Sequence, residues 1–260
     1  MGKPTAMITG PVMSTTITPT NTHMTEAVTL PALYRLLAFL SPSFPVGAFT
    51  YSHGLEQVIE DGTVKTAEDL LSWLEDVLRH GAGRSDAILL KKSYEAALMG
   101  DDSTLTELQD LALALQPSKE RHLETSAQGT AFLVAVRQSW RPDGRSPAAD
   151  LFNQRAEDSN QSWPYPVALG LAAAAHEIPD EAALVAYLHA FAGNIVSAAI
   201  RAVPLGQSNG QSVLASLEPT VFAVAAMANS ASLEDIGSST FLADIASMAH
   251  ETQYSRLFRS

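Results

Sequence analysis

Histidine is the residue type in this 260-residue chain best suited to chemistry near neutral pH, and the chain has seven of them. No two stand three or four residues apart, the spacing that turns two imidazoles toward one metal ion from a single helix face. We therefore expect the internal histidines to be hydrogen-bonded or exposed and not to bind metal: His53, His80, His122, His176 and His189. The chain has no cysteine, which excludes disulfides, thiolate nucleophiles, zinc fingers and iron–sulfur clusters. Any chemistry has to use oxygen and imidazole groups.

Known catalytic signatures are also missing. The sequence contains no phosphate-binding loop, no H-E-x-x-H helix, no G-x-S-x-G elbow and no three-glycine dinucleotide turn. Gly81-Ala82-Gly83 is followed by Asp86 where a third glycine would be required, so it predicts a corner between two helices. We predict no catalytic, cofactor-binding or metal-binding residue. One enzymatic alternative stays open, an all-α hydrolase that uses buried carboxylates, and a cluster of acids in one deep pocket would favour it.

The charge and composition exclude further classes of function. The chain has 16 basic and 28 acidic residues, a net charge of -12, and no basic block that could bind a nucleic acid backbone. With 46% hydrophobic residues it can build a sizeable core. Its most apolar stretch, residues 182–203, contains His189, Asn194, Ser197 and Arg201, so we expect a buried amphipathic helix and no membrane span. The N-terminus lacks a secretory signal pattern, which leaves a cytoplasmic protein as the default expectation.

The elements that must position any functional residue are predicted to be helices. Residues 66–80 are the clearest case, because Thr66 and Asp69 have the capping-box spacing and the leucines and valine that follow fall on one helix face. We predict helices at residues 66–80, 86–99, 103–116, 118–140, 147–158, 166–176, 180–203, 208–217 and 219–230. Since no stretch alternates apolar and polar residues over a strand length, the predicted fold is all-α: a single helical-bundle-like domain of about ten helices with short Pro/Gly connections.

The two ends of the chain differ from this domain. Residues 1–29 are rich in threonine and low in charge, which predicts a disordered leader or an expression extension, with His23-Met24 as the possible start of the native frame. The helical domain is placed at residues 30–246. Residues 247–260 are predicted to be a C-terminal partner-binding tail.

Three segments do not look like generic helix, and the first is residues 41–56. Pro42 and Pro45 fix the entry of a turn, and Gly47 relieves backbone crowding before a helix that would carry Phe49 and Tyr51 near its start. The hydroxyls of this segment, including that of Ser52, could satisfy free amide donors at that start. A rigid corner between two helices and a partner-docking corner are both open.

The second segment is residues 201–211, a helix end followed by a Gly/Gln turn. Arg201 sits in the last helical turn before Pro204, where the helix dipole favours a cation, and that role alone is one interpretation. The amide side chains of Gln207 and Gln211 indicate a polar interface instead.

The third segment is the C-terminus. Residues 252–260 contain Arg256 and Arg259 and no acid, and Tyr254, Leu257 and Phe258 have helical spacing, which predicts an apolar stripe flanked by arginines. A frayed chain end is one interpretation. A tail that orders on binding a partner is the other, because aromatic residues and arginine are typical interface anchors.

These segments together resemble the UreF family of urease accessory proteins. The resemblance spans about residues 33–260 and rests on SPSFPVGAFTYSHGLE (41–56), RAVPLGQ (201–207) and HETQYSRLFRS (250–260), with weaker agreement at SKERHLE (118–124) and Gly129. Lys119, where the family more often has Arg, and Pro164, near which it has His, are departures that put any partner contact there in doubt.

The resemblance implies an all-α, dimeric, non-enzymatic protein. UreF proteins join UreD (also called UreH) and the GTPase UreG in a complex that inserts nickel into apo-urease, with UreE usually delivering the metal. By resemblance, nickel and GTP are handled by the partner proteins, and this chain binds no cofactor. The residues implied in partner binding are Pro42, Pro45, Gly47, Phe49, Tyr51, Ser52, Gly54, Glu56, Arg201, Pro204, Gly206, Gln207, His250, Glu251, Tyr254, Arg256, Leu257 and Arg259.

Our hypothesis is therefore a non-enzymatic adaptor that bridges UreD and UreG, so that GTP hydrolysis is coupled to nickel transfer. The alternatives are the all-α hydrolase and a nickel-storage protein.

Overall fold

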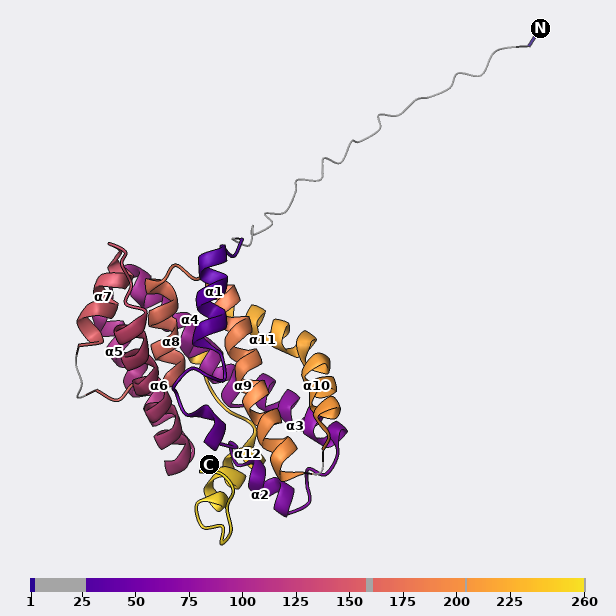
Figure 1. The fold of residues 1–260 in the computed structure, drawn as a ribbon. Coiled ribbons are helices and arrows are strands. Elements are labelled where there is room, and N and C mark those ends of the chain that lie inside the picture. The colour runs from indigo at the N-terminus through magenta and orange to yellow at the C-terminus, as the bar shows by residue number, and fades with distance from the viewer. Residues whose placement is uncertain (3–26, 158–160, 204, 260) are drawn as a thin grey trace.

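A computed structural model describes residues 1–2, 27–157, 161–203 and 205–259. Nearly all of the predicted leader, and also Pro204, lie outside these ranges. The described residues form α-helices and two short 3₁₀ helices without any strand, which confirms the predicted all-α single domain (Figure 1). The elements are α1 (Leu30–Phe39), η1 (Ala48–Thr50), α2 (Leu55–Glu60), α3 (Ala67–His80), α4 (Ala82–Met99), α5 (Asp102–Ala114), α6 (Lys119–Ser139), α7 (Pro147–Arg155), α8 (Tyr165–Ala175), α9 (Asp180–Ala202), α10 (Gln207–Ser216), α11 (Glu218–Ser230), η2 (Leu233–Asp235) and α12 (Phe241–His250).

Local sequence explains where many of these helices begin and end. The predicted capping box at α3 is confirmed: the Thr66 hydroxyl accepts from the amide of Asp69, and the Asp69 carboxylate accepts from the amide of Thr66. The hydroxyl of Ser118 accepts from the amide of Arg121 at the start of α6. Gly81 separates α3 from α4, which confirms the predicted helix corner.

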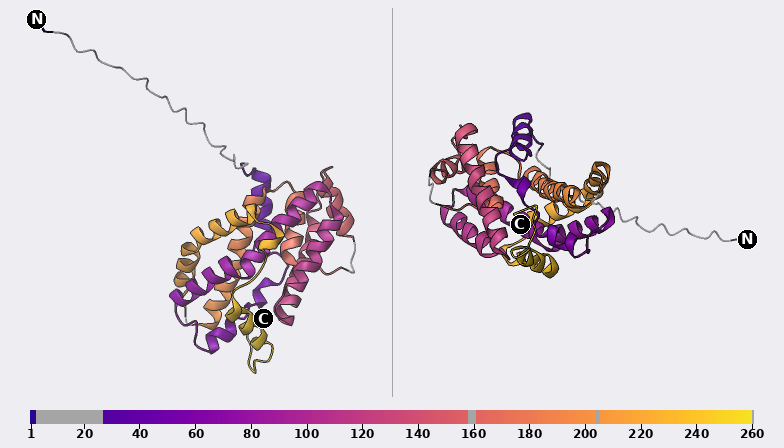
Figure 2. Two further views of the ribbon diagram at one scale, coloured as in Figure 1. Left: turned by 180° about the vertical axis from the view of Figure 1, so that it is seen from behind. Right: turned by 60° about the horizontal axis from the view of Figure 1, so that its bottom comes forward.

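The core is centred on α4 and α8, which pack closely along their lengths. Every residue of α8 from Pro166 to Ala175 is buried, and its alanines and Gly170 allow the close approach. A Cβ on Gly170 would lie 2.1 Å from Ser93 Oγ and 2.4 Å from the carbonyl oxygen of Leu90 in α4. Helices α3, α5, α7, α9 and α11 surround α4. The left view of Figure 2 shows the yellow C-terminal segment at the lower end of the bundle.

Helix α9 is the one helix among the described residues long and apolar enough to cross a membrane. It packs against α2, α3, α4, α8, α10 and α11, and more than half of its apolar window is buried in the protein. These contacts are those of a core helix, as the sequence predicted.

The structure corrects two local predictions. The helix expected directly after Gly47 is wrong: only the 3₁₀ turn η1 forms there, and α2 begins at Leu55. The chain cannot continue as a helix because His53 and Gly54 have positive φ angles of 58° and 75°. The helical stripe predicted for residues 252–260 is also wrong, because the described part of that segment has no helix. The helix at this end is α12, which spans the boundary drawn between residues 246 and 247.

Candidate functional site

The three segments singled out in the sequence meet at one end of the bundle. We call residues 41–56 the corner and residues 251–259 the tail. The tail leaves α12 and turns back over the corner, where the amide of Arg259 donates to the carbonyl of Thr50 at 2.8 Å. The last turn of α9 reaches the same place, since Arg201 Nη2 donates to the carbonyl of Phe49 at 2.7 Å. Segments about 150 residues apart in sequence therefore build one surface (Figure 1).

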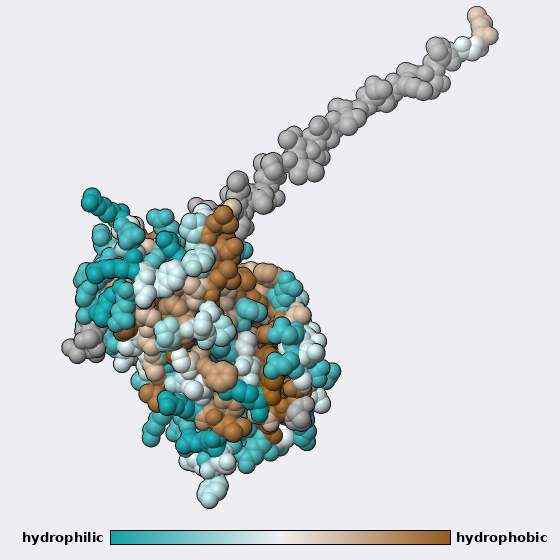
Figure 3. Space-filling view, in the orientation of Figure 1, coloured by the Kyte–Doolittle hydropathy of each residue, from teal (hydrophilic) through white to brown (hydrophobic). Residues whose placement is uncertain are grey.

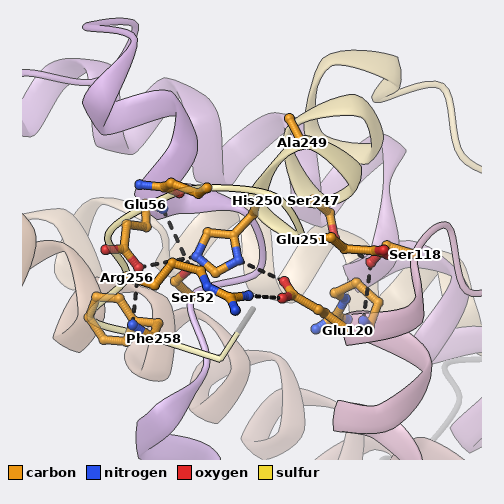
Figure 4. A network of polar contacts seen from close by, with 12 residues as sticks. Ser52, Glu56, Ser118, Glu120, Ser247, Ala249, His250, Glu251, Arg256 and Phe258 are labelled. Carbon is orange, nitrogen blue, oxygen red and sulfur yellow. Dashed lines mark hydrogen bonds and ion pairs between the residues drawn. The ribbon is translucent and has the colours of Figure 1, made fainter.

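Glu56, in the first turn of α2, holds the tail on the corner. Its carboxylate accepts from the amides of Leu257 at 2.7 Å and Phe258 at 3.0 Å, and from His250 Nε2 at 3.1 Å (Figure 4). The side chain is buried, with Glu56 only 7% exposed. The Ser52 hydroxyl accepts from the amide of Glu56 at 3.4 Å and so supports the start of α2.

His250, the last residue of α12, has no exposed surface and lies between two carboxylates. Its Nδ1 is 2.6 Å from Glu120 in α6, and its Nε2 faces Glu56. The ring therefore bridges α6 and α2 through both of its nitrogens. Arg256 Nη1 also donates to Glu120, at 2.6 Å. These contacts form one network that joins α2, α6, α12 and the tail, with Arg256 at its exposed edge.

Further contacts fasten the end of α12 and the start of the tail to α6. The Ser247 and Ser118 hydroxyls are 2.6 Å apart, and Glu251 accepts from the amide of Lys119 at 2.7 Å (Figure 4). Because Lys119 contributes its backbone amide, the departure from Arg at this position leaves the contact unchanged.

The tail buries one aromatic side chain and exposes its other large apolar side chains. Phe258 is 5% exposed and packs into the core, whereas Leu257 is 71% exposed and Tyr254 fully exposed. The backbone amides of 257 and 258 bind Glu56, so they cannot form the helical hydrogen bonds that the predicted stripe requires. The tail is an irregular strap of turns and bends, on which Tyr254 and Leu257 are exposed.

The structure brings together only part of the predicted partner-binding set. Pro42, Pro45 and Gly47 form an exposed turn at the edge of the corner. Gly206 and Gln207 are exposed at the start of α10 and take no part in the network described above. Tyr51, Ser52 and Gly54 are buried beneath the tail and α12: a Cβ on Gly54 would lie 2.7 Å from the backbone nitrogen of Ser247.

A buried polar cluster beneath the corner was missed by the sequence analysis. Glu124 of α6 accepts from His53 Nε2 at 2.8 Å and from Gln128 Nε2 at 3.0 Å, and it pairs with Arg121. Nearby, the Tyr187 hydroxyl donates to Asp86 at 2.7 Å. The only signal was that charged residues stand on helix positions facing the core, which the sequence by itself does not distinguish from a solvated face.

This cluster surrounds a cavity of about 30 Å³. A cavity of that size holds water but no organic substrate. Its two acids are already hydrogen-bonded to neighbouring side chains, so the cluster gives the hydrolase hypothesis no support. Among the described residues there is also no group of three or more His, Asp or Glu side chains arranged to hold a metal ion.

The environments of the two buried acids shift their pKa values in opposite directions. Burial raises the pKa of Asp86 to about 6, and Arg121 offsets this only in part. Burial would also raise the pKa of Glu124, but the charges of Arg121 and His53 more than offset it and bring the value to about 2. For His53, burial and then Arg121 lower the pKa, against the opposing effect of Glu124. At neutral pH the cluster therefore contains a neutral His53 imidazole and an Arg121–Glu124 ion pair. It also contains the Asp86 carboxylate, whose ionised form is destabilised by burial.

We expect Asp86→Asn to stabilise the protein above neutral pH. The pKa of Asp86 is about 6 in the folded protein and 3.8 in the unfolded chain. The wild type therefore loses folding stability as the pH rises from about 4 to about 6, and it does not regain this stability at higher pH. The substituted amide can still accept from Tyr187 and has no charge to bury, so urea unfolding at pH 8 should show a gain of about 2 kcal/mol that vanishes near pH 4. The exposed Asp110→Asn is the control, and equal pH dependence in both variants would contradict the assignment.

Comparison with known proteins gives a consistent result. The family model described as UreF matches residues 64–218. The chain is 50% identical over 229 residues to "Urease accessory protein UreF" of Rhodopseudomonas palustris (strain HaA2), covering 88% of this chain and 94% of that protein. It is 48% identical over 241 residues to the protein of the same name from Bradyrhizobium sp. (strain BTAi1), covering 92% and 97%. It is 49% identical over 226 residues to the protein of the same name from Methylorubrum populi, covering 87% of this chain and 98% of that protein.

Proposed function

The chain belongs to the UreF family of urease accessory proteins, and from this premise we propose that it is an adaptor without catalytic activity that bridges UreD (UreH) and the GTPase UreG. Family membership places the chain in urease maturation. In our proposal the bridge couples GTP hydrolysis by UreG to nickel transfer into apo-urease, in the cytoplasm. Nickel and GTP are bound by the partner proteins and not by this chain.

The tail that is fastened to the corner carries this proposal. It presents Tyr254 and Leu257 outward beside Arg256, and Phe49 of the corner is 61% exposed on the same surface. Exposed aromatic and aliphatic side chains next to arginine are typical anchors of protein interfaces. Because the Glu56–His250–Glu120–Arg256 network already orders the tail, a partner binds a preformed surface and less ordering entropy opposes binding.

The outer face of α12 extends this surface. Helix α12 is amphipathic, but its large apolar side chains face outward. They are those of Phe241, Leu242, Ile245 and Met248. An exposed apolar stripe of this length marks an interaction surface more often than a solvated one. In our proposal the α12 face and the adjoining tail bind UreD, and the exposed part of the corner around Phe49 recruits UreG.

A second apolar surface supports a homodimer. A groove of about 1440 Å³ lies between α1, α9 and α11, and Leu33 and Leu37 of α1 and Phe222 of α11 are exposed along it. Figure 3 shows hydrophobic side chains over α1 and in the hollow beside it. A second copy offers the same α1 ridge to the same groove, which is the self-complementary arrangement of a two-fold interface.

The test is to mix the purified chain with UreD and UreG and to measure masses by size exclusion with light scattering. We expect a ternary complex, and for the isolated chain twice its mass of 27.7 kDa. Leu37→Glu should shift the isolated chain to the monomer mass, because the charge would be buried in the groove. Leu123→Glu, at an exposed leucine of α6 outside the groove, should leave the dimer intact.

Two outcomes would contradict the proposal. One is that no ternary complex forms although all three proteins are folded. The other is tight, stoichiometric binding of nickel to the isolated chain in equilibrium dialysis, which would favour the nickel-storage alternative.

A further inference from the structure

We propose that Arg201 is the positioning residue of the tail: its guanidinium, held between the rings of Phe49 and Phe258, fixes the end of the chain against the corner and α9. The contribution to partner binding rests on the adaptor function proposed above. The positioning of the tail does not, because it concerns the isolated chain.

Two aromatic rings lie close to the guanidinium of Arg201. The centre of the guanidinium lies 3.6 Å from the centroid of the Phe49 ring and 4.4 Å from that of Phe258. Its Nη2 donates to the carbonyl of Phe49 at 2.7 Å, and its Nε donates to the carbonyl of Ser197 at 3.1 Å. One side chain of α9 therefore contacts the corner through a ring and a carbonyl, and the tail through a second ring.

These contacts require more than a positive charge at a helix end. A lysine in the last turn of α9 would stabilise the helix dipole equally well, because that interaction needs only a point charge. Only arginine offers a planar cation that stacks on aromatic faces while its fork donates to two carbonyls. Burial lowers the pKa of Arg201, yet a guanidinium remains charged in proteins, so the contact with both rings stays cationic.

Arg201 is the contact that ties the end of the tail to α9. The other polar contacts of this region do not reach α9. Glu56 of α2 binds the amides of 257 and 258, Glu120 of α6 contacts His250 and Arg256, and the Thr50 carbonyl in the corner accepts from the amide of Arg259. Phe258 is the residue that both sets share, because its amide binds Glu56 and its ring faces Arg201. Loss of Arg201 should therefore loosen the last residues of the tail and Phe49 together, while α12 and the core remain in place.

The test is hydrogen–deuterium exchange on the full chain, comparing Arg201→Leu and Arg201→Lys with the wild type. We expect the amides of residues 257–259 to exchange about five- to tenfold faster in Arg201→Leu. Arg201→Lys should recover part of the protection, because the charge remains over the rings. Arg137→Gln removes a cation from the last turn of α6 and is the matched control, in which tail exchange should not change.

A double variant separates stacking from general destabilisation. Phe258→Leu keeps an apolar side chain but removes the ring face, so Arg201→Leu should have a smaller effect in that background than alone. Unchanged tail exchange in Arg201→Leu, or additive effects in the double variant, would overturn the positioning role.

Binding of UreD to the same variants tests the functional consequence separately. Affinity should fall in the order wild type, Arg201→Lys, Arg201→Leu, in parallel with tail protection. If the tail loosens and UreD binding does not change, the positioning role stands and the proposed use of the tail as a UreD surface fails.

Discussion

The Glu56→Gln variant should release the tail from the corner and abolish the ternary complex. Glu56 satisfies three buried donors at once, the amides of Leu257 and Phe258 and one nitrogen of His250. The glutamine side chain has the same shape, but its single oxygen cannot accept hydrogen bonds from all three donors. Its NH₂ group would face backbone amides or the His250 ring nitrogen, which also donate. Of the two carboxylates that contact the His250 ring, only that of Glu120 would remain.

The expected cost is large for an isosteric change. Each buried donor left unpaired costs about 1–3 kcal/mol, and Glu56→Gln leaves at least one of the three donors unpaired. The tail can escape part of this cost by leaving the corner, so we expect local release and not global unfolding. The measurement is exchange of the 257 and 258 amides, which should approach the rate of free peptide while the amides of α4 and α8 stay protected.

Glu60→Gln is the matched control for this experiment. Glu60 lies one turn further along α2, is exposed, and contacts the tail only through Gln253. Its replacement should change neither tail exchange nor complex formation. Two results on Glu56→Gln would count against the mechanism: a lost complex with a fully protected tail would place Glu56 in the interface itself, and a released tail with an intact complex would remove the tail from the interface.

The sequence could predict the helices whose pattern follows the ordinary rule. Helix α3 has its apolar side chains inside and a capping box at its start, and its predicted bounds match the structure. Helix α12 escaped prediction because its pattern is inverted: Phe241 and Ile245 face outward, and the buried side contains Ser247 and His250. In a helix that packs against the protein core, the apolar residues are the buried ones. A helix whose apolar face is left exposed does not follow that pattern.

The site could be predicted as three segments but not as one assembly. Composition singled out the corner, the end of α9 and the tail, since aromatic residues, prolines and arginines stand out in an alanine-rich chain. That Glu56 would accept from the amides of 257 and 258, or that Arg201 would lie between two rings, depends on the packing of helices distant in sequence. The buried Glu124 was missed for the same reason, because its partner His53 comes from a different segment.

The Gly129→Ala variant, in the middle of α6, should strongly destabilise the protein. Here α6 crosses the chain just before α8, and a Cβ on Gly129 would lie 1.9 Å from the carbonyl oxygen of Trp163 and 2.7 Å from the carbonyl carbon of Pro164. Both contacts are with backbone atoms, which cannot rotate away as a flexible side chain would. The departure from histidine at Pro164 thus lies at a helix contact inside the protein.

The surrounding structure leaves the backbone of residues 163–165 little freedom to move. The amide of Trp163 donates to the Thr130 hydroxyl at 3.1 Å, and the amide of Tyr165 donates to the Thr125 hydroxyl at 3.1 Å, so both ends of the segment are fixed to α6. The Trp163 side chain is also buried in the core. Relief of the overlap therefore requires α6 and α8 to separate and to give up packing on both sides of the contact.

We expect Gly129→Ala to lower the free energy of unfolding by about 3 kcal/mol or more and the melting temperature by roughly 6–12 °C. Gly193→Ala in α9 is the control, because its Cβ would meet no atom within 4 Å. There the same methyl should raise helix propensity and stabilise by about 0.5–1 kcal/mol. Thermal unfolding measured at equal protein concentration compares the two, and similar melting temperatures would mean that the α6–α8 contact is not backbone against backbone.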